Sequence, residues 1–104
     1  YIEDLTDCMI KMIKIKKSKN MLFNITFGNS RTINELVNII KIHIKNVKVK
    51  SIKRDKLMPY RGTLSNQKIG KVLKFYPKYN LETGVKKLIE WYKLNYKNEF
   101  KKKN

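Results

Sequence analysis

The sequence contains no alanine and only a few cysteines, prolines and glycines. Among its 104 residues are one cysteine, two prolines and four glycines. The lone Cys8 excludes a disulfide within the chain and cannot form a metal site by itself. No apolar run reaches the roughly 18 residues that a membrane-spanning helix needs, and no segment resembles a signal peptide. These absences favour a cytoplasmic protein that does not bind a membrane.

Arginine and acidic residues are scarce, whereas lysine is abundant. The chain has 25 basic and 8 acidic residues, which gives a net charge of +17, yet only Arg31, Arg54 and Arg61 are arginines. Nucleic-acid readers usually exploit the planar arginine fork. The excess of lysine, isoleucine and asparagine over alanine is typical of A/T-rich codons. No specific nucleic acid is therefore expected, and a small lysine-rich nucleic-acid- or polyanion-binding module stays the alternative hypothesis.

The hydrophobic pattern predicts six elements in one domain or part of one. Helices are expected at 3–16, from Thr32 to about 45, at 66–75 and at about 82–98. Strands are expected at 21–27 and, on a solvent-facing edge, at 47–52. Thr32 and Glu35 form a capping-box signature, and Asn80 can cap the last helix. This order, helix-strand-helix-strand-helix-helix, indicates an α/β fold with too few strands for an independent sheet.

Three stretches carry motifs of a known family. Residues 1–5 read YIEDL. Residues 23–36 combine FNI-x-x-G with TI-x-EL, and residues 64–92 combine LS-x-x-K with later P, LE-x-G and WY motifs. In this order the stretches resemble the C-terminal part of extended short-chain dehydrogenases/reductases, the NAD-dependent nucleotide-sugar epimerase and dehydratase family. The sequence departs from the family at Ser65, Gln67 and Lys74, and the frequent R-x-G-D motif is not intact.

The resemblance implies that residues 1–96 are the substrate-binding part of a Rossmann-type enzyme, and that 97–104 form a charged, disordered tail. Such enzymes act as homodimers on a nucleotide-diphosphate sugar. NAD or NADP takes a hydride from the sugar, usually at C4, and epimerisation, dehydration or reduction follows. Neither the Gly-rich cofactor turn nor the Y-x-x-x-K pair occurs in this chain. The sequence therefore predicts no catalytic residue here, an inactive and poorly stable isolated chain, and a remainder of the enzyme that supplies both motifs.

The resemblance also suggests substrate-binding residues. Arg61 and Arg54 could hold the diphosphate through bidentate hydrogen bonds, although both could equally be solvated loop charges. Tyr1 and Asp4 would line the substrate cleft, while capping at the helix start explains Asp4 equally well. Tyr60 could stack on the base or the sugar, or pack on the core. The sequence leaves open which arginine binds the diphosphate.

Several other residues favour structural roles. His43 has no partner at a telling spacing and is expected to be structural or exposed. Cys8 falls on the apolar face of the first predicted helix, which favours a buried, inert thiol. Trp91 and Tyr92 are expected to be core aromatics. A non-catalytic remnant of an enzyme is a further possibility, which would hold if the parent protein lacked the Y-x-x-x-K pair.

Overall fold

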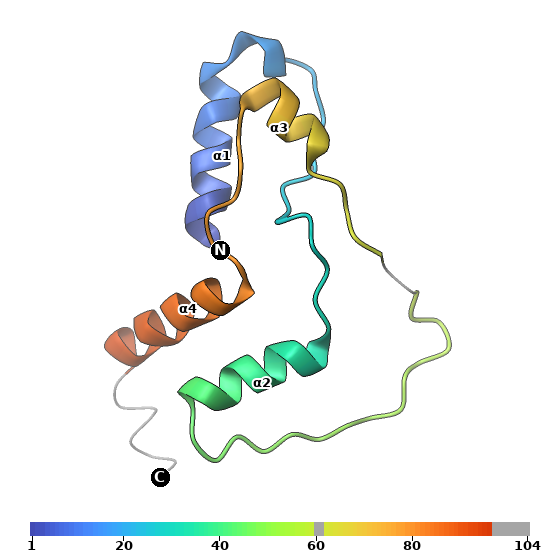
Figure 1. Cartoon of the computed structure of the whole chain (residues 1–104), viewed down its shortest axis with the longest axis vertical. Coiled ribbons are helices and arrows are strands. Elements are labelled where there is room, and N and C mark those ends of the chain that lie inside the picture. Colours follow the sequence, from blue (N-terminus) through green and yellow to red (C-terminus); the bar gives the residue numbers. More distant parts are fainter. Residues whose placement is uncertain (60–61, 97–104) are drawn as a thin grey trace.

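The computed structural model describes residues 1–59 and 62–96. In these ranges the chain forms four α-helices and one short 3-10 helix, arranged as in Figure 1. They are α1 (Ile2–Lys14), η1 (Lys16–Ser18), α2 (Ile33–His43), α3 (Gln67–Leu73) and α4 (Leu81–Asn95). All four predicted helices are confirmed, with ends that differ by a few residues. The predicted tail at 97–104 lies outside the described residues.

The predicted α/β fold is wrong, because the described part of the chain contains no strand. The segment at 21–27 lies beside residues 65–68. The hydrogen bonds between the two come from side chains and not from a second backbone, as they would in a sheet. Lys68 Nζ donates to the carbonyl of Leu22 at 2.8 Å, and Asn66 Nδ2 donates to the carbonyl of Phe27 at 3.2 Å. A ladder needs a second backbone to supply those donors. The alternating pattern of 21–27 therefore gives an extended segment rather than a strand.

The second predicted strand, at 47–52, is also absent. It belongs to a long connection between α2 and α3 that follows the outer edge of the molecule (Figure 1). Val49 and Ile52 are exposed there, and no described segment pairs with them. Alternation of apolar residues with lysine is thus not sufficient for a strand where no neighbouring strand is present.

Side-chain caps fix the starts of α2 and α4. Thr32 Oγ1 accepts from the Glu35 amide at 3.2 Å, and Glu35 Oε2 accepts from the Thr32 amide at 2.7 Å. This reciprocal pair confirms the predicted capping box. Asn80 Oδ1 accepts from the Thr83 amide at 2.9 Å, which confirms the second predicted cap. Both helices therefore begin where local sequence chemistry places them.

The main apolar cluster joins α1 and α3. Its buried members are Cys8, Ile69, Leu73 and Phe75. Cys8 is fully buried, as predicted, and burial raises the pKa of its thiol. A thiol with a raised pKa carries little of the reactive thiolate. Cys8 therefore contributes to the packing of the core and is a poor nucleophile.

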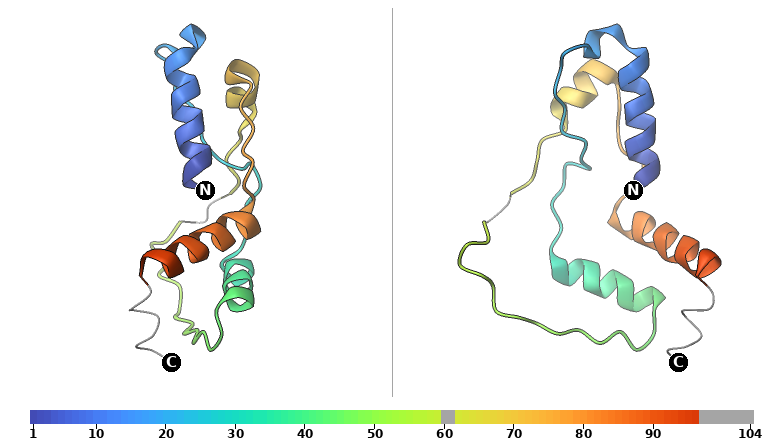
Figure 2. Two further views of the ribbon diagram at one scale, coloured as in Figure 1. Left: turned by 90° about the vertical axis from the view of Figure 1, so that its left-hand side faces the viewer. Right: turned by 180° about the vertical axis from the view of Figure 1, so that it is seen from behind.

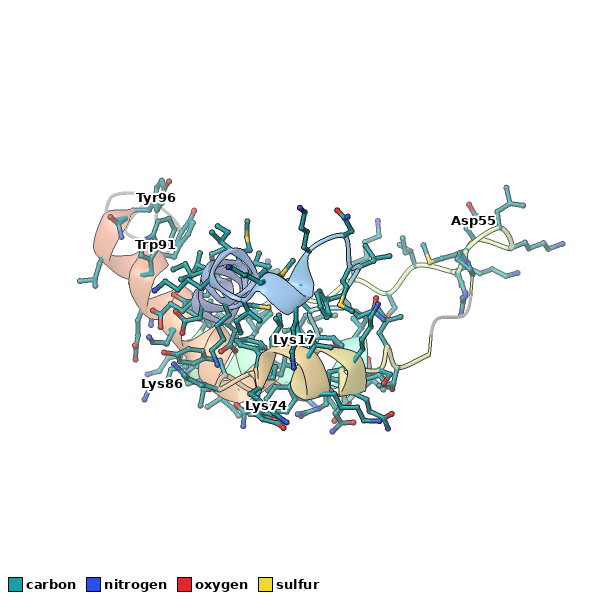
Figure 3. The ribbon with its side chains drawn as sticks, turned by 90° about the horizontal axis from the view of Figure 1, so that it is seen from above. Lys17, Asp55, Lys74, Lys86, Trp91 and Tyr96 are labelled. Atoms are coloured by element: carbon teal, nitrogen blue, oxygen red, sulfur yellow. The ribbon has the colours of Figure 1, made fainter. Side chains whose placement is uncertain are left out.

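A second, smaller contact joins α2 to α4. Ile39 of α2 and Ile89 of α4 are buried on these helices. Trp91, expected in the core, is instead 49% exposed and packs edge-on against Tyr96, with ring centroids 5.8 Å apart. Figure 3 shows Trp91 and Tyr96 together at the end of α4. The prediction of a core tryptophan is wrong, because α2 covers another face of α4.

The two helix pairs occupy opposite ends of an elongated molecule. Figure 2 shows extended segments connecting the α1 and α3 end with the α2 and α4 end. The Cα radius of gyration is 17.4 Å, against about 13 Å for a compact domain of this length. The junction where α1, the segment at 27–31 and the start of α4 meet therefore holds the two ends together.

Candidate ligand-binding site

A buried carboxylate attaches the start of α1 to the segment that leads into α4. Asp4 is only 5% exposed. Its Oδ1 accepts from the Lys78 amide at 2.9 Å, and its Oδ2 accepts from the Tyr79 amide at 3.0 Å. No side chain caps the start of α1 itself. The prediction that Asp4 caps its own helix is therefore wrong, since the carboxylate holds two distant backbone amides.

Two tyrosines and an ion pair lie next to this attachment. The rings of Tyr1 and Tyr79 meet edge-on with centroids 5.3 Å apart. Lys87 Nζ lies 5.4 Å from the Tyr1 centroid and 4.7 Å from that of Tyr79. Glu3 accepts from Lys87 Nζ at 2.9 Å and from the Tyr79 hydroxyl. We call these four residues the tyrosine cluster; it joins α1 to α4.

An arginine bridges the starts of α2 and α4. Arg31 Nε donates to Glu35 Oε1 at 2.8 Å, and Arg31 Nη2 donates to Glu82 Oε1 at 2.6 Å. Glu35 is also the carboxylate of the capping box. The guanidinium is thus held by one carboxylate from each helix. Its remaining N–H groups have no partner among the described residues.

A cavity of about 410 Å³ lies between the tyrosine cluster and Arg31. This volume falls within the range of about 300–1,000 Å³ of small-molecule sites. Its aromatic lining comes from Tyr1, Phe27 and Tyr79. Each of the three family-like stretches therefore contributes to one cavity: residues 1–5, residues 23–36 and residues 64–92.

The polar lining of the cavity is small and largely uncharged. It consists of Asn29, Arg31 and Asn80, and aliphatic side chains of α4 complete the wall. Asn80 Oδ1 is used in the helix cap. The Asn29 side chain makes no hydrogen bond within the described residues. Few polar groups in an apolar wall are typical of a site that orients a small ligand.

Ion pairing shifts the pKa of the charged groups around the cavity. Hydrogen bonds from Arg31 lower the pKa of Glu82, and hydrogen bonds from Tyr79 and Lys87 lower that of Glu3. The Glu3 carboxylate and the Tyr79 hydroxyl raise the pKa of Lys87. These carboxylates therefore stay ionised, and Lys87 stays protonated, throughout the physiological range.

The junction is expected to loosen in acid. Because folding lowers the Glu3 and Glu82 pKa values below 4.5, their contribution to stability is complete above pH 4.5. It is lost as the pH falls through the lowered values. Folding raises the pKa of Lys87, so its pH dependence is the reverse. The contribution of Lys87 to stability is complete below pH 10.5 and is lost as the pH rises through the raised value. An NMR titration of the side-chain carboxyl carbons should give midpoints below 4.5.

The variant Arg31→Gln should change the titration of Glu82 and leave that of Glu3 unchanged. The Glu82 midpoint should return towards 4.5, because Arg31 is the main cause of its shift. The Glu3 midpoint should stay low, since Tyr79 and Lys87 cause it. Equal movement of both midpoints would contradict this assignment of causes.

The structure brings together only some of the predicted site residues. Tyr1 lines the 410 Å³ cavity, and Asp4 lines a neighbouring one of about 350 Å³. Arg54 lies in the outer loop, where its Nη2 donates to the Met58 carbonyl at 2.7 Å. Figure 3 shows the next residue, Asp55, far out from the helices. Tyr60 and Arg61 lie outside the described residues.

Sequence reasoning missed Arg31, Asn29 and Tyr79 as candidates. Arg31 is one of only three arginines and directly precedes the Thr32 cap. Its scarcity and its position in the turn before α2 could have identified it. Tyr79 carries no comparable signal, because its place in the cavity depends on the contact with Asp4 across the chain.

The residues present do not fit NAD or NADP. A dinucleotide site needs glycines that let a turn approach the pyrophosphate. In this chain Gly28, with φ +82°, lies against Asn66, and Gly70 lies against Tyr76. Within residues 1–59 and 62–96 no Gly-rich turn precedes a helix. No group of three His, Cys, Asp or Glu side chains in those ranges could hold a metal ion either.

Comparison with protein-family models, with curated proteins and with solved structures finds no significant match to the chain. In the described ranges, the helices are too short or too polar to cross a membrane. The resemblance to nucleotide-sugar epimerases and dehydratases thus rests on the quoted motifs alone.

Proposed function

We propose that this chain forms the sugar-nucleotide-binding part of an NAD(P)-dependent nucleotide-sugar epimerase or dehydratase. One observation carries the proposal. The three stretches that resemble the family are far apart in the sequence, and all of them line the 410 Å³ cavity. Contact with ligand is one physical reason for distant motifs to meet at a single cavity.

The loop at 53–64 is the proposed diphosphate-binding element. Thr63 Oγ1 donates to Ser30 Oγ at 2.6 Å and accepts from the Ser30 amide at 3.3 Å. Ser30 is flanked in sequence by Asn29 and Arg31 of the cavity. The end of the arginine-bearing loop is therefore attached beside the cavity. In this proposal Arg61 holds the diphosphate.

The remaining chemistry belongs to another part of the enzyme in this proposal. The Gly-rich turn for NAD or NADP and the Y-x-x-x-K pair are supplied there, because the residues of this chain do not fit the cofactor. The enzyme works as a homodimer in the cytoplasm. What this chain contributes is binding and orientation of the sugar nucleotide.

Replacing Arg61 tests the proposal in the whole polypeptide that carries this chain. Arg61→Gln should weaken the affinity for UDP-glucose, measured by calorimetry, by about tenfold, because a charge-assisted bond to the diphosphate is lost. Lys53→Gln is the matched control, since it removes one charge from the same loop without removing an arginine fork. It should change the affinity by less than about twofold.

The alternative, a polyanion-binding module, predicts another outcome. The net charge of +17 favours it. A module of that kind would bind inorganic polyphosphate as well as UDP-glucose, with affinity falling steeply as salt rises. Equal losses in Arg61→Gln and Lys53→Gln, together with that salt dependence, would replace the proposed function with this one.

A further inference from the structure

A cavity of about 370 Å³ lies between α1 and the segment that connects α3 to α4. Its lining residues are Asp7, Ile10 and Lys11 of α1 and Lys74, Phe75, Tyr76 and Lys78 of the connecting segment. None of them lines the 410 Å³ cavity of the candidate site. The volume is near the lower end of the range of about 300–1,000 Å³ for small-molecule sites. This second cavity is therefore separate from the candidate site and has room for one small ligand.

The lining of this second cavity is positively charged. In the part of the chain that the structure describes, three lysines and one aspartate line it, which gives a net charge of +2. Asp7 Oδ2 pairs with Lys78 Nζ at 3.1 Å. Among the described residues, no carboxylate pairs with Lys11 or Lys74. A phosphate monoester carries a charge of about −1.5 to −2 at pH 7 and therefore matches this lining.

The backbone of Lys74 has an unusual conformation. At the end of α3 this residue is left-handed, with φ +49°, where glycine or asparagine is usual because a β-carbon is unfavourable there. Its carbonyl accepts from Lys11 Nζ at 3.1 Å, which joins the two walls of the cavity. Lys74 is also a position at which the sequence departs from the family of the proposed function. A lysine retained in a strained conformation beside a cavity points to a role for its charge.

Tyr76 supplies an exposed aromatic surface to the same cavity. The residue is 68% exposed, yet one edge of its ring lies over the buried Gly70 of α3. A β-carbon at Gly70 would lie only 3.2 Å from Tyr76 Cε1. Glycine weakens a helix, but at this position it leaves room for the tyrosine ring. A ring held in this way suits packing against a planar group of a ligand.

We infer that this second cavity binds a small aromatic phosphate. Lys74 and Lys78 hold the phosphate as point charges, and Tyr76 packs against the aromatic ring of the ligand. Asp7 competes with the phosphate for Lys78, so it weakens binding. The inference does not depend on the proposed function, because the two cavities share no lining residue.

Calorimetry with phenyl phosphate as the probe tests the phosphate contacts in the whole polypeptide that carries this chain. Lys74→Gln should weaken binding by about tenfold, because a charge-assisted bond is lost. Lys71→Gln is the matched control, since Lys71 is exposed on α3 and does not line the cavity. It should change the affinity by less than about twofold. Equal losses in both variants would show general attraction to a lysine-rich surface and would overturn the inference.

Asp7→Asn gives a result that misfolding cannot imitate. It should strengthen phenyl phosphate binding by about threefold, because it frees Lys78 and removes the one negative charge from the described lining. Unchanged or weaker binding in Asp7→Asn would overturn the role given to Lys78 and with it the inferred site.

Two further titrations test the aromatic contact and the location. Inorganic phosphate should bind about fivefold more weakly than phenyl phosphate, and Tyr76→Leu should remove most of that difference. Equal affinity of the unaltered polypeptide for both probes would contradict the aromatic part of the inference. Saturating UDP-glucose should leave phenyl phosphate binding within about twofold. Displacement by UDP-glucose would overturn the separate site while leaving the proposed function intact, and absence of phenyl phosphate binding would overturn the inference alone.

Discussion

The isolated 104-residue chain is expected to unfold without a cooperative transition. Its accessible surface is 9508 Å², whereas a compact monomer of its mass exposes about 6,000 Å². Only six apolar residues are buried in the described part: Cys8, Ile39, Ile69, Leu73, Phe75 and Ile89. Burial of apolar area is the main favourable term in folding. So small a core cannot balance the conformational entropy of the chain.

Two helices carry large apolar side chains that remain exposed in the described part of the chain. On α1, Met9 is 51% and Ile13 is 86% exposed. On α4, Leu88 and Leu94 are 53% and 69% exposed. Helices that are apolar on more than one face are normally covered on each. These faces need further protein surface before the fold becomes stable.

Circular dichroism against temperature, with calorimetry on the same sample, measures this directly. The expected signal is a gradual loss of helicity without a heat-absorption peak, together with rapid amide exchange in α2 and α4. A sharp transition with equal calorimetric and van't Hoff enthalpies in a monomer would contradict the prediction.

Replacing Asp4 by asparagine is expected to destabilise the fold, because its carboxylate is buried and bonded to two backbone amides. The Asp4 carboxylate accepts from the Lys78 and Tyr79 amides, one on each oxygen. Asparagine retains one acceptor and turns an NH₂ group towards the other amide. A buried amide left without its acceptor costs about 2 kcal/mol. The free energy of unfolding of the whole polypeptide that carries this chain should fall by about that amount in urea titrations.

Asp7→Asn is the matched control on the same helix. Asp7 pairs with Lys78 Nζ at 3.1 Å, and both side chains are largely exposed. Exposed pairs of this kind contribute about 0–1 kcal/mol. The difference between the two variants should therefore exceed about 1 kcal/mol. Equal effects would show that Asp4 acts only through surface charge and not through its buried hydrogen bonds.

Helix positions could be predicted because their signals are local. The Thr32 and Glu35 capping box and the Asn80 cap act within three residues of the chain. A buried Cys8 follows from its place on an apolar helix face. The caps do not depend on what lies elsewhere in the molecule, whereas Cys8 is buried only because Ile69, Leu73 and Phe75 cover it.

Strands could not be decided in the same way. Residues 21–27 have the composition of a strand, but a strand exists only when another backbone lies beside it. In the described part, side chains of Lys68 and Asn66 bond the carbonyls of this segment instead. The described residues therefore contain helices and no sheet, because no second backbone pairs with this segment.

The candidate site was likewise only partly predictable. The sequence predicts Tyr1 at the site but not Arg31 or Tyr79. These two residues line the cavity because segments that are distant in the sequence lie together. The helices, their caps and the excess of positive charge follow from the sequence alone, since each depends on residue identity or short-range spacing. The absence of a sheet from the described residues and the role of Asp4 follow only from the tertiary structure. Both depend on which segments, far apart in the sequence, lie side by side.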